Sequence, residues 1–180
     1  MTDPASGPFL FDTSAESWLA RAQQAAVQDW LRRYLALHQV HVSAVTVLQR
    51  SRGYALLWRS VPAERRSAIE TARVAYLGQL GRVWALDAAT AVVAGEIMAL
   101  IPQPPTPPRK THGWVEPRQE RLSRWRFDAL IAATALVARM PLIHNNAEDF
   151  EAIRSAIERS PARFPGLGPL ELLRSPALAP

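Results

Sequence analysis

The sequence lacks cysteine altogether, so neither a disulfide bond nor a thiolate metal site can form. It also lacks a glycine-rich loop of the kind that cradles phosphate groups, which disfavours a protein built on such a loop. Its most apolar stretch, residues 83–101, is interrupted by Asp87 and Glu96 and is too broken to cross a membrane. The first residues, MTDPASGP, do not have the basic and then apolar order of a signal peptide. These absences predict a cytoplasmic protein without a membrane segment.

Lysine is nearly absent as well. Of the 21 basic residues only Lys110 is a lysine, and the net charge is +5. The planar guanidinium group of arginine suits bidentate contact with phosphate, so a polyanionic partner is one explanation of this composition. A genome rich in G and C, which favours arginine codons, is an equally good explanation. The charge alone therefore identifies no partner.

The composition is that of a folded domain. The chain has 180 residues, of which 48% are hydrophobic and 21% are charged, as in soluble globular domains. We expect a single domain over residues 1–180, with a proline-rich loop insertion at about 102–117. A proline-rich C-terminal tail is expected from about residue 160, with little regular structure and a mobile end.

Short apolar segments alternate with amphipathic segments along the chain. Strands are predicted at about 8–12, 40–46, 82–87 and 140–145. Helices are predicted at about 15–38, 47–58, 62–81, 88–100, 127–139 and 146–159. This alternation is typical of an α/β fold with three layers, α/β/α, around a central and mostly parallel sheet.

Three aspartates stand at the junctions of these elements. Asp12 ends the first predicted strand, Asp128 begins a helix, and Asp149 follows the fourth strand by a few residues. Because sites in parallel sheets lie at the carboxyl ends of the strands, these acids can line one shared cleft. Carboxylates that repel one another favour a divalent cation, and oxygen ligands favour Mg²⁺ or Mn²⁺ over zinc. Taken singly, each acid is also explained as a helix N-cap.

Four segments in sequence order, FLFDTS, VSAVTVLQRSRG, FDALIAATAL and PLIHNNAEDFEAI, resemble the signature segments of PIN-domain ribonucleases. The likeness covers residues 8 to about 153 and is greatest to the VapC-type toxins of toxin–antitoxin modules. It implies a PIN-like fold and a metal-dependent endoribonuclease that cuts RNA, such as tRNA. It also implies a cognate antitoxin and a homodimer.

The resemblance assigns roles to individual residues. Asp12, Asp128 and Asp149 would be the ligands of Mg²⁺ or Mn²⁺, which activates water for in-line attack on a phosphoryl group. Thr13 or Ser14 would support the first acid through a hydrogen bond. Asn146 would hold the loop that presents Asp149.

Two features depart from the family pattern. Gln49 stands where the second segment usually has a catalytic glutamate. Loss of that charge is expected to weaken metal binding about tenfold or more and to slow cleavage. The segment before Asp128 is also longer than usual, because of the proline-rich insertion. A catalytically impaired PIN-fold module that binds RNA or protein is therefore the alternative hypothesis. A receiver domain is disfavoured, since the only lysine, Lys110, lies in the insertion and not near the last strand.

Other polar residues near the predicted strand ends have more ordinary explanations. His144 is expected at the edge of the pocket and not as a metal ligand. Asp87 is expected to cap the helix that follows it. Glu96 lies on the same helix and is expected within reach of the cleft.

Aromatic and basic residues divide into two predicted groups. The tryptophans expected in the core are Trp18, Trp30, Trp58 and Trp84. Two others, Trp114 and Trp125, flank or lie in the basic segment and are better candidates for contact with RNA or a partner. Four arginines precede or surround the approach to Asp128 and form either a solvated surface or a phosphate-facing patch: Arg118, Arg121, Arg124 and Arg126.

Overall fold

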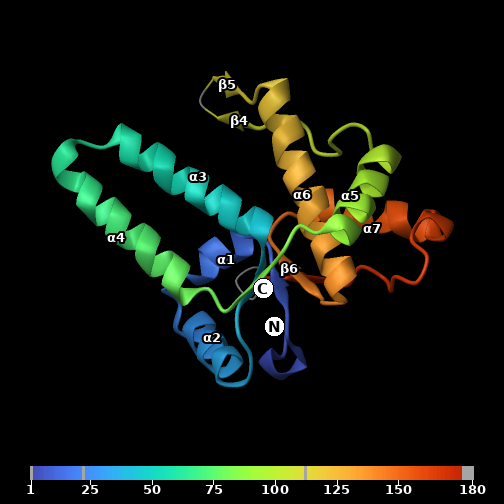
Figure 1. Cartoon of the computed structure of the whole chain (residues 1–180), viewed down its shortest axis with the longest axis horizontal. Coiled ribbons are helices and arrows are strands. Elements are labelled where there is room, and N and C mark those ends of the chain that lie inside the picture. Colours follow the sequence, from blue (N-terminus) through green and yellow to red (C-terminus); the bar gives the residue numbers. More distant parts are fainter. Residues whose placement is uncertain (1, 22, 112, 176–180) are drawn as a thin grey trace.

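The chain folds around a five-stranded sheet, seen in a computed structural model that describes residues 2–21, 23–111 and 113–175 (Figure 1). The strand order is β3-β2-β1-β6-β7. The strands are β1 (Leu10–Phe11), β2 (His41–Ser43), β3 (Arg82–Trp84), β6 (Leu142–His144) and β7 (Leu172–Arg174), and every neighbouring pair is parallel. Helices cover both faces of this sheet, so the predicted three-layer α/β/α fold is confirmed.

The helices follow the predicted order, with changes at their ends. They are α1 (Thr13–Leu19), α2 (Ala25–Leu37), α3 (Ala44–Ser60), α4 (Ala63–Gln79), α5 (Ala88–Leu100), α6 (Arg118–Ala138) and α7 (Ala147–Arg159). The single helix predicted over 15–38 is wrong, because the chain turns between α1 and α2. The strand predicted over 40–46 ends at Ser43, whose hydroxyl accepts the Val45 N–H and caps α3.

Two hydrophobic clusters lie on opposite faces of the sheet. Side chains alternate along each strand, so Leu10 enters one cluster while Phe11 enters the other. The first cluster joins the sheet to α5, α6 and α7, and the second joins it to α1 and α2. In the second cluster Trp30 stacks on Tyr34, and the Tyr34 hydroxyl accepts the Phe9 N–H at 3.1 Å. The core prediction for Trp30 is thus confirmed.

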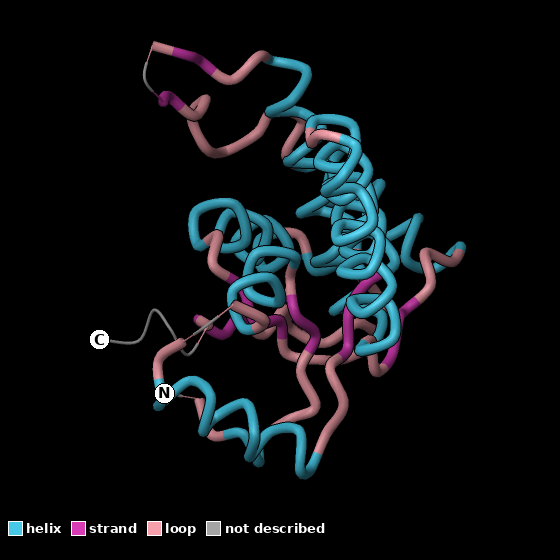
Figure 2. The backbone as a smooth tube through the Cα atoms, turned by 90° about the vertical axis from the view of Figure 1, so that its left-hand side faces the viewer, coloured by secondary structure: helices cyan, strands magenta, loops and turns pink. Residues whose placement is uncertain are grey.

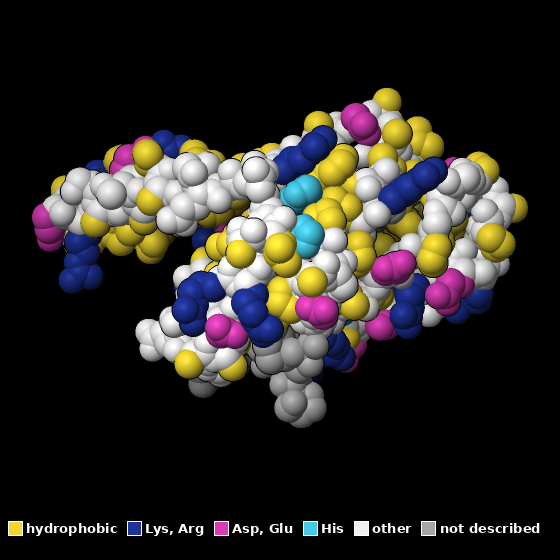
Figure 3. Space-filling model, turned by 90° about the horizontal axis from the view of Figure 1, so that it is seen from below, with side chains coloured by type: hydrophobic (Ala, Val, Ile, Leu, Met, Phe, Trp, Pro, Cys, Tyr) yellow, Lys and Arg dark blue, Asp and Glu magenta, His cyan; other side chains and the backbone are white. Residues whose placement is uncertain are grey.

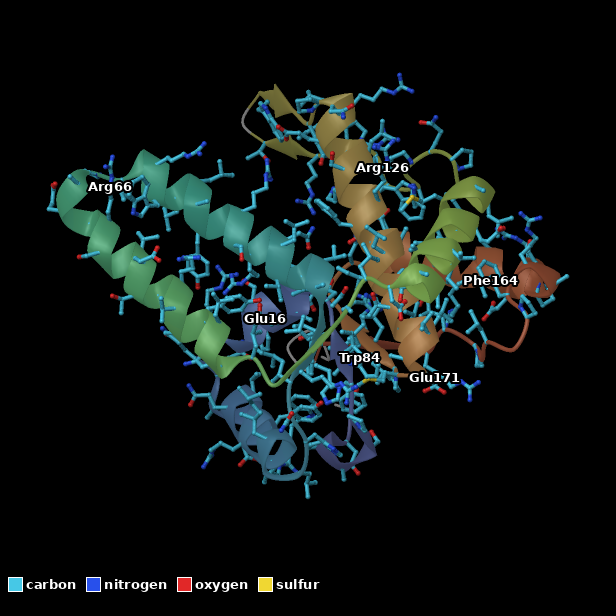
Figure 4. All side chains as sticks on the ribbon, viewed as in Figure 1. Glu16, Arg66, Trp84, Arg126, Phe164 and Glu171 are labelled. Atoms are coloured by element: carbon cyan, nitrogen blue, oxygen red, sulfur yellow. The ribbon has the colours of Figure 1, made fainter. Side chains whose placement is uncertain are left out.

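Helices α3 and α4 pack against each other and form an arm that projects from the body (Figures 1 and 2). Hydrophobic side chains remain exposed along this arm, among them Leu56, Val74 and Trp58 (Figure 3). Trp58 stacks under the Arg66 guanidinium, 4.4 Å from the ring centroid, at the outer part of the arm (Figure 4). The core prediction for Trp58 is therefore wrong.

The two proline-rich segments contain more regular structure than predicted. In the insertion, β4 (Lys110–Thr111) pairs with β5 (Trp114–Val115) as an antiparallel hairpin. In the tail, β7 adds a parallel strand beside β6. The expected mobile end falls on residues 176–180, which lie outside the described residues. Helix α6 begins at Arg118, nine residues before the predicted start, so Asp128 lies within a helix and not at its beginning.

Candidate active site: an acidic cluster at the carboxyl edge of the sheet

Asp12 follows β1 directly and is the N-cap of α1. Its carboxylate accepts the Ala15 N–H at 2.5 Å and the Ser14 hydroxyl at 2.8 and 3.0 Å. The side chain is buried. Ser14 thus contacts the first acid, whereas Thr13 turns to residues of α3. The N-cap explanation holds for Asp12 and is compatible with a place in the cleft.

Asp128 lies where α6 passes the carboxyl edge of the sheet. Its carboxylate is buried, and its Oδ2 accepts the Asn146 Nδ2 at 3.0 Å. The same Nδ2 also donates to Oδ2 of Asp149 at 2.6 Å. Two carboxylates from different helices therefore share one amide nitrogen. Because Asp128 sits in the interior of α6, the N-cap explanation is excluded for it.

Asp149 belongs to the first turn of α7 and is 0% exposed. Its Oδ1 accepts the Thr106 N–H at 3.3 Å. Its Oδ2 accepts the Thr106 hydroxyl at 3.2 Å, Nη1 of Arg124 at 2.9 Å and the Asn146 amide. The proline-rich insertion and α6 thus reach the same carboxylate.

Burial governs the protonation of the cluster. It raises the pKa of Asp12 to about 6, against the lowering effect of the hydrogen bonds from Ala15 and Ser14. Burial also raises the pKa of Asp128 well above its usual range, and the negative charges of Asp149 and Asp12 raise it further. The structure therefore brings the three predicted acids into one electrostatically coupled cluster.

Gln49 lies on α3 and contacts Thr13, the residue that follows Asp12. Its Oε1 accepts the Thr13 hydroxyl, which also lies 3.3 Å from the Thr46 hydroxyl. Across the part of the chain that the structure describes, no side-chain hydrogen bond joins Gln49 to Asp12, Asp128 or Asp149. Gln49 is thus placed on the Thr13 side of α1.

The donor set fits a hard divalent cation, because three buried carboxylates supply oxygen ligands of the kind that Mg²⁺ and Mn²⁺ prefer. In this structure the three carboxylates accept hydrogen bonds from other groups of the protein. Among the described residues, no group of three or more His, Asp or Glu side chains is arranged to hold a metal ion. Residues that would hold one are Asp12, Asp128 and Asp149, once Asp149 is released from its donors.

No family model matches the sequence, and no curated protein matches it. Solved structures match its fold. VapBC2 from Rickettsia felis, bound to a promoter DNA fragment, gives a TM-score of 0.58 at 13% identity over 92% of this chain and 97% of that chain. FitAcB from Neisseria gonorrhoeae gives a TM-score of 0.55 at 24% identity, over 81% of this chain and 93% of that chain. DNA-bound VapBC from Salmonella typhimurium gives a TM-score of 0.55 at 17% identity, over 92% of this chain and 96% of that chain. The chain has a PIN-like fold.

Three further predictions about polar residues of this PIN-like fold have different outcomes. Asp87 caps α5 through the Thr90 N–H at 2.8 Å, as predicted. Glu96 pairs with Arg163 at 2.6 Å, away from the acids, so its expected place near the cleft is wrong. His144 is buried and packs on Phe150, not at the pocket edge. Burial lowers the pKa of His144 to about 4.

The basic segment before Asp128 is helical, which separates its arginines by face. Arg118 and Arg126 are exposed, as Figure 4 shows for Arg126, while Arg121 donates to the Pro104 carbonyl at 3.1 Å. Arg124 is turned inward to Asp149. Arg118 and Arg126 therefore face solvent, whereas Arg124 faces the cleft.

Of the two tryptophans in this region only one is exposed. Trp125 is buried in the core, so its predicted contact with RNA is wrong. Trp114 is exposed on β5, and its role stays a prediction.

Two residues of the site were missed from the sequence, Thr106 and Glu116. Both lie in the insertion that was predicted only as a proline-rich loop at about 102–117. One signal was present: Arg124 and Asp128 are four residues apart, a spacing that places them on one helix face. It was hidden because the helix was expected to begin only at 127.

In the described ranges, no helix combines the length and the apolar character needed to cross a membrane.

Proposed function

We propose that this chain is a metal-dependent endoribonuclease of the toxin–antitoxin type. The observation that carries the proposal is the convergence of Asp12, Asp128 and Asp149, from three separate elements, in one buried and mutually repelling cluster. Repelling carboxylates are retained in a fold where a cation binds between them. The PIN-like fold shared with the VapBC and FitAcB structures supports the same function.

Each residue of the cluster has a separate part in this proposal. Mg²⁺ or Mn²⁺ would supply activation of water and neutralisation of phosphoryl charge. Ser14 and the Ala15 N–H fix the orientation of Asp12. Asn146 holds the carboxylates of Asp128 and Asp149 at one point. These contacts orient the carboxylates of Asp12 and Asp128 before any ligand arrives.

The substrate would approach through a cleft beside the acids. This cleft has a volume of about 300 Å³ and is lined by Thr106, Pro107, Pro108, Arg109, Arg124, Asn146 and Glu148. Its two guanidinium groups suit the phosphates of an RNA backbone. Lys110 and the exposed Trp114 continue the basic and aromatic surface along the hairpin.

The decisive experiment is cleavage of RNA by the purified chain with Mg²⁺ or Mn²⁺. We expect cleavage of single-stranded and tRNA-like substrates, stopped by EDTA and restored by added Mn²⁺. Asp149→Asn should abolish it, because a neutral amide replaces the most buried carboxylate of the cluster. Asp87→Asn, an aspartate on a distant helix cap, is the matched control and should cut normally. Cleavage that survives both EDTA and Asp149→Asn would overturn the proposal.

A catalytically impaired module is the second candidate, and Gln49 favours it. Gln49 is neutral and accepts a hydrogen bond from Thr13, the residue that follows Asp12. If the missing charge limits activity, Gln49→Glu should bind Mn²⁺ about tenfold more tightly and cut RNA faster. A Glu variant that binds and cuts no better, in a wild-type chain that also does not cut, would favour the non-catalytic module.

The partner we propose is a small antitoxin protein, with a homodimer of the chain as the assembly it inhibits. A groove of about 490 Å³ lies between α1, α2, α3 and α4. Its walls are mainly apolar and include Leu19, Leu31 and Leu35. Glu16 lies at the groove beside Arg50, between α1 and the arm (Figure 4). An amphipathic helix with its own charged residue fits such a surface.

A further inference from the structure

The Arg124 guanidinium group donates hydrogen bonds to two acids, Glu116 and Asp149. Its Nε and Nη2 donate to the two carboxylate oxygens of Glu116, both at 3.1 Å. The remaining Nη1 donates to Asp149 at 2.9 Å and lies 3.2 Å from the Thr106 hydroxyl. The bidentate pair with Glu116 fixes the plane of the guanidinium group, so Nη1 is aimed into the acidic cluster.

Oδ2 of the Asp149 carboxylate has no lone-pair site left for another ligand in this arrangement. Its Oδ2 receives three donors, from Thr106, Arg124 and Asn146, although a carboxylate oxygen offers about two lone-pair sites. Its Oδ1 receives the Thr106 N–H, and the side chain is 0% exposed. Any cation that binds Asp149 must therefore displace donors that are already there.

We propose that Arg124 and Thr106 form a latch that competes with the divalent cation for Asp149. This inference rests on the proposed metal site and adds a conformational step to it. Binding of the cation moves Nη1 and the Thr106 hydroxyl off Asp149, and the segment around Thr106 is released with them. Arg124 keeps a partner after release, because Glu116 holds two of its three nitrogen atoms.

The latch also connects the cation to the hairpin. Glu116 accepts the Arg109 N–H at 3.1 Å through its side chain, and its own N–H donates to the Arg109 carbonyl at 2.9 Å. The base of the hairpin is thus tied to the same carboxylate that holds Arg124. When the cation frees Asp149, the contact between the insertion and α7 is lost while the contact between the hairpin and α6 stays.

If Arg124 competes with the cation, Arg124→Gln changes metal affinity in the opposite direction from the change expected if Arg124 only supports Asp149. In a latch, the positive charge of Arg124 opposes the cation, so Arg124→Gln strengthens metal binding. Glu116 neutralises part of that charge, so Glu116→Gln weakens metal binding. If Arg124 and Glu116 only hold Asp149 in place, both substitutions weaken binding.

The experiment is calorimetric titration of the full chain with Mn²⁺. We expect a dissociation constant about tenfold lower for Arg124→Gln and several-fold higher for Glu116→Gln than for the wild type. Arg121→Gln is the matched control, since Arg121 lies one turn earlier on α6 and contacts the insertion at Pro104 without reaching the acids. It should bind as the wild type does.

The outcomes separate this inference from the proposed function. If the wild type binds Mn²⁺ and Asp149→Asn does not, the metal site stands. The latch is then overturned if Arg124→Gln binds with the wild-type constant or more weakly. If neither the wild type nor Arg124→Gln binds Mn²⁺, the proposed metal site and the latch both fail.

A second measurement needs no variant and keeps the test valid if Arg124→Gln does not fold. Thr106 has the only backbone N–H in residues 104–108, because the other four are prolines. Its amide signal in protein labelled with ¹⁵N-threonine therefore reports the contact to Asp149 alone. Saturating Mg²⁺, which is diamagnetic, should shift this signal and increase its hydrogen exchange. Unchanged or slower exchange at Thr106 would overturn the latch. The buried Thr134 amide, within α6, should be unaffected.

Discussion

A buried carboxylate is stable only where donors or cations replace the water it has lost, and the acids of this cluster differ in how well that is done. Asp149 has four donated hydrogen bonds, and Asp12 has three from Ser14 and Ala15. Asp128 has one, from Asn146, and faces two other negative charges. Asp128 is therefore the acid that the fold without metal tolerates least.

Asp128→Asn should stabilise the metal-free protein. The amide keeps the shape and an oxygen for the Asn146 donor, while the charge that burial and two neighbours oppose is removed. We expect a gain of about 1–3 kcal/mol in the free energy of unfolding at pH 7. A raised pKa in the folded state costs stability as the pH rises from the unfolded value near 3.9, so the gain should be smaller at pH 5. Urea unfolding at both pH values measures it.

The same variant should lose Mn²⁺ binding and RNA cleavage. A stable variant without activity would mean that Asp128 is a metal ligand whose charge destabilises the fold when no cation is bound. A fall in stability without metal would mean instead that Asp128 is a structural residue, and the proposed role would then be wrong for it.

His144 should make the protein sensitive to acid. Burial lowers its pKa in the folded state to about 4, below the unfolded value of about 6.5. Between these values the unfolded chain binds more protons, so stability falls as the pH is lowered from 6.5 towards 4. The loss from this residue should total about 2–3 kcal/mol. His144→Asn should remove that slope.

The slope is the measurement to be compared, by urea unfolding at several pH values. Lost packing against Phe150 lowers the stability of His144→Asn equally at every pH and does not mimic the effect. Asp12 acts in the opposite direction, since its pKa is raised to about 6 and its protonation favours the folded state below that pH. A variant with the wild-type slope would mean that His144 is not held neutral.

At the scale of the elements, the hairpin of β4 and β5 divides into a packed base and an exposed tip. At the base, Glu116 and Thr106 are buried and contact Arg124. Towards the tip, Trp114 on β5 is 47% exposed and pairs with Thr111, which follows Lys110 on β4. The base belongs to the acidic cluster, so removing the whole insertion would disturb the site as well as any RNA contact. A change that affects RNA binding more than stability is therefore expected only at the tip.

Trp114→Ala should weaken RNA binding without lowering stability. A base stacked on an aromatic ring contributes about 1–3 kcal/mol, so we expect affinity for single-stranded RNA to fall about tenfold. Trp58→Ala is the matched control, because Trp58 is 40% exposed but lies on the arm, away from the acids. Fluorescence anisotropy with a labelled RNA measures both. Equal effects of the two variants, or none from Trp114→Ala, would exclude the tip as an RNA contact.

The elements that were predicted from the sequence are those with a strong local signal. Helix α5 was predicted at its observed bounds, because Asp87 caps it and Pro102 follows it closely. The first turns of α6 were missed, since polar residues after several prolines give no apolar period. Strand β7 was missed because three residues in a proline-rich tail become a strand only by pairing with β6.

The candidate site divides in the same way. Asp12 and Asp149 could be named because they stand at element boundaries, and all three acids lie in segments that resemble a known family. Thr106 and Glu116 could not, since nothing local marks them. Their contacts with Asp149 and Arg124 exist only because the insertion folds back over α6, which is a tertiary effect. The interior position of Asp128 was hidden for the same reason.

At the scale of the whole molecule, the acidic cluster and the groove between α1, α2, α3 and α4 meet different parts of α1. Asp12 caps the amino end of α1 and contributes to the cluster. Glu16, Leu19 and Ala20, further along the same segment, line the groove. Glu16 also feels the charge of Asp12, so the two surfaces are electrostatically connected through one short helix. A protein seated in the groove would therefore lie within reach of the proposed active site.

Leu35→Glu should prevent neutralisation by the antitoxin while RNA cleavage continues. Leu35 lines the groove and is 51% exposed in the free chain, so a glutamate there leaves the core intact. In the complex it would place a charge in an apolar interface, which costs several kcal/mol when it has no partner. Co-expression with the proposed antitoxin should rescue cell growth for the wild type and fail to rescue it for Leu35→Glu.

Leu37→Glu is the matched control for this experiment. Leu37 ends the same helix and is 62% exposed, but it is not part of the groove. The two variants add the same charge to the same helix, so a general effect on α2 would change both. Because the groove alone distinguishes them, only Leu35→Glu should escape the antitoxin, and size-exclusion chromatography should find it unbound. Two variants that are both neutralised would place the partner on another surface.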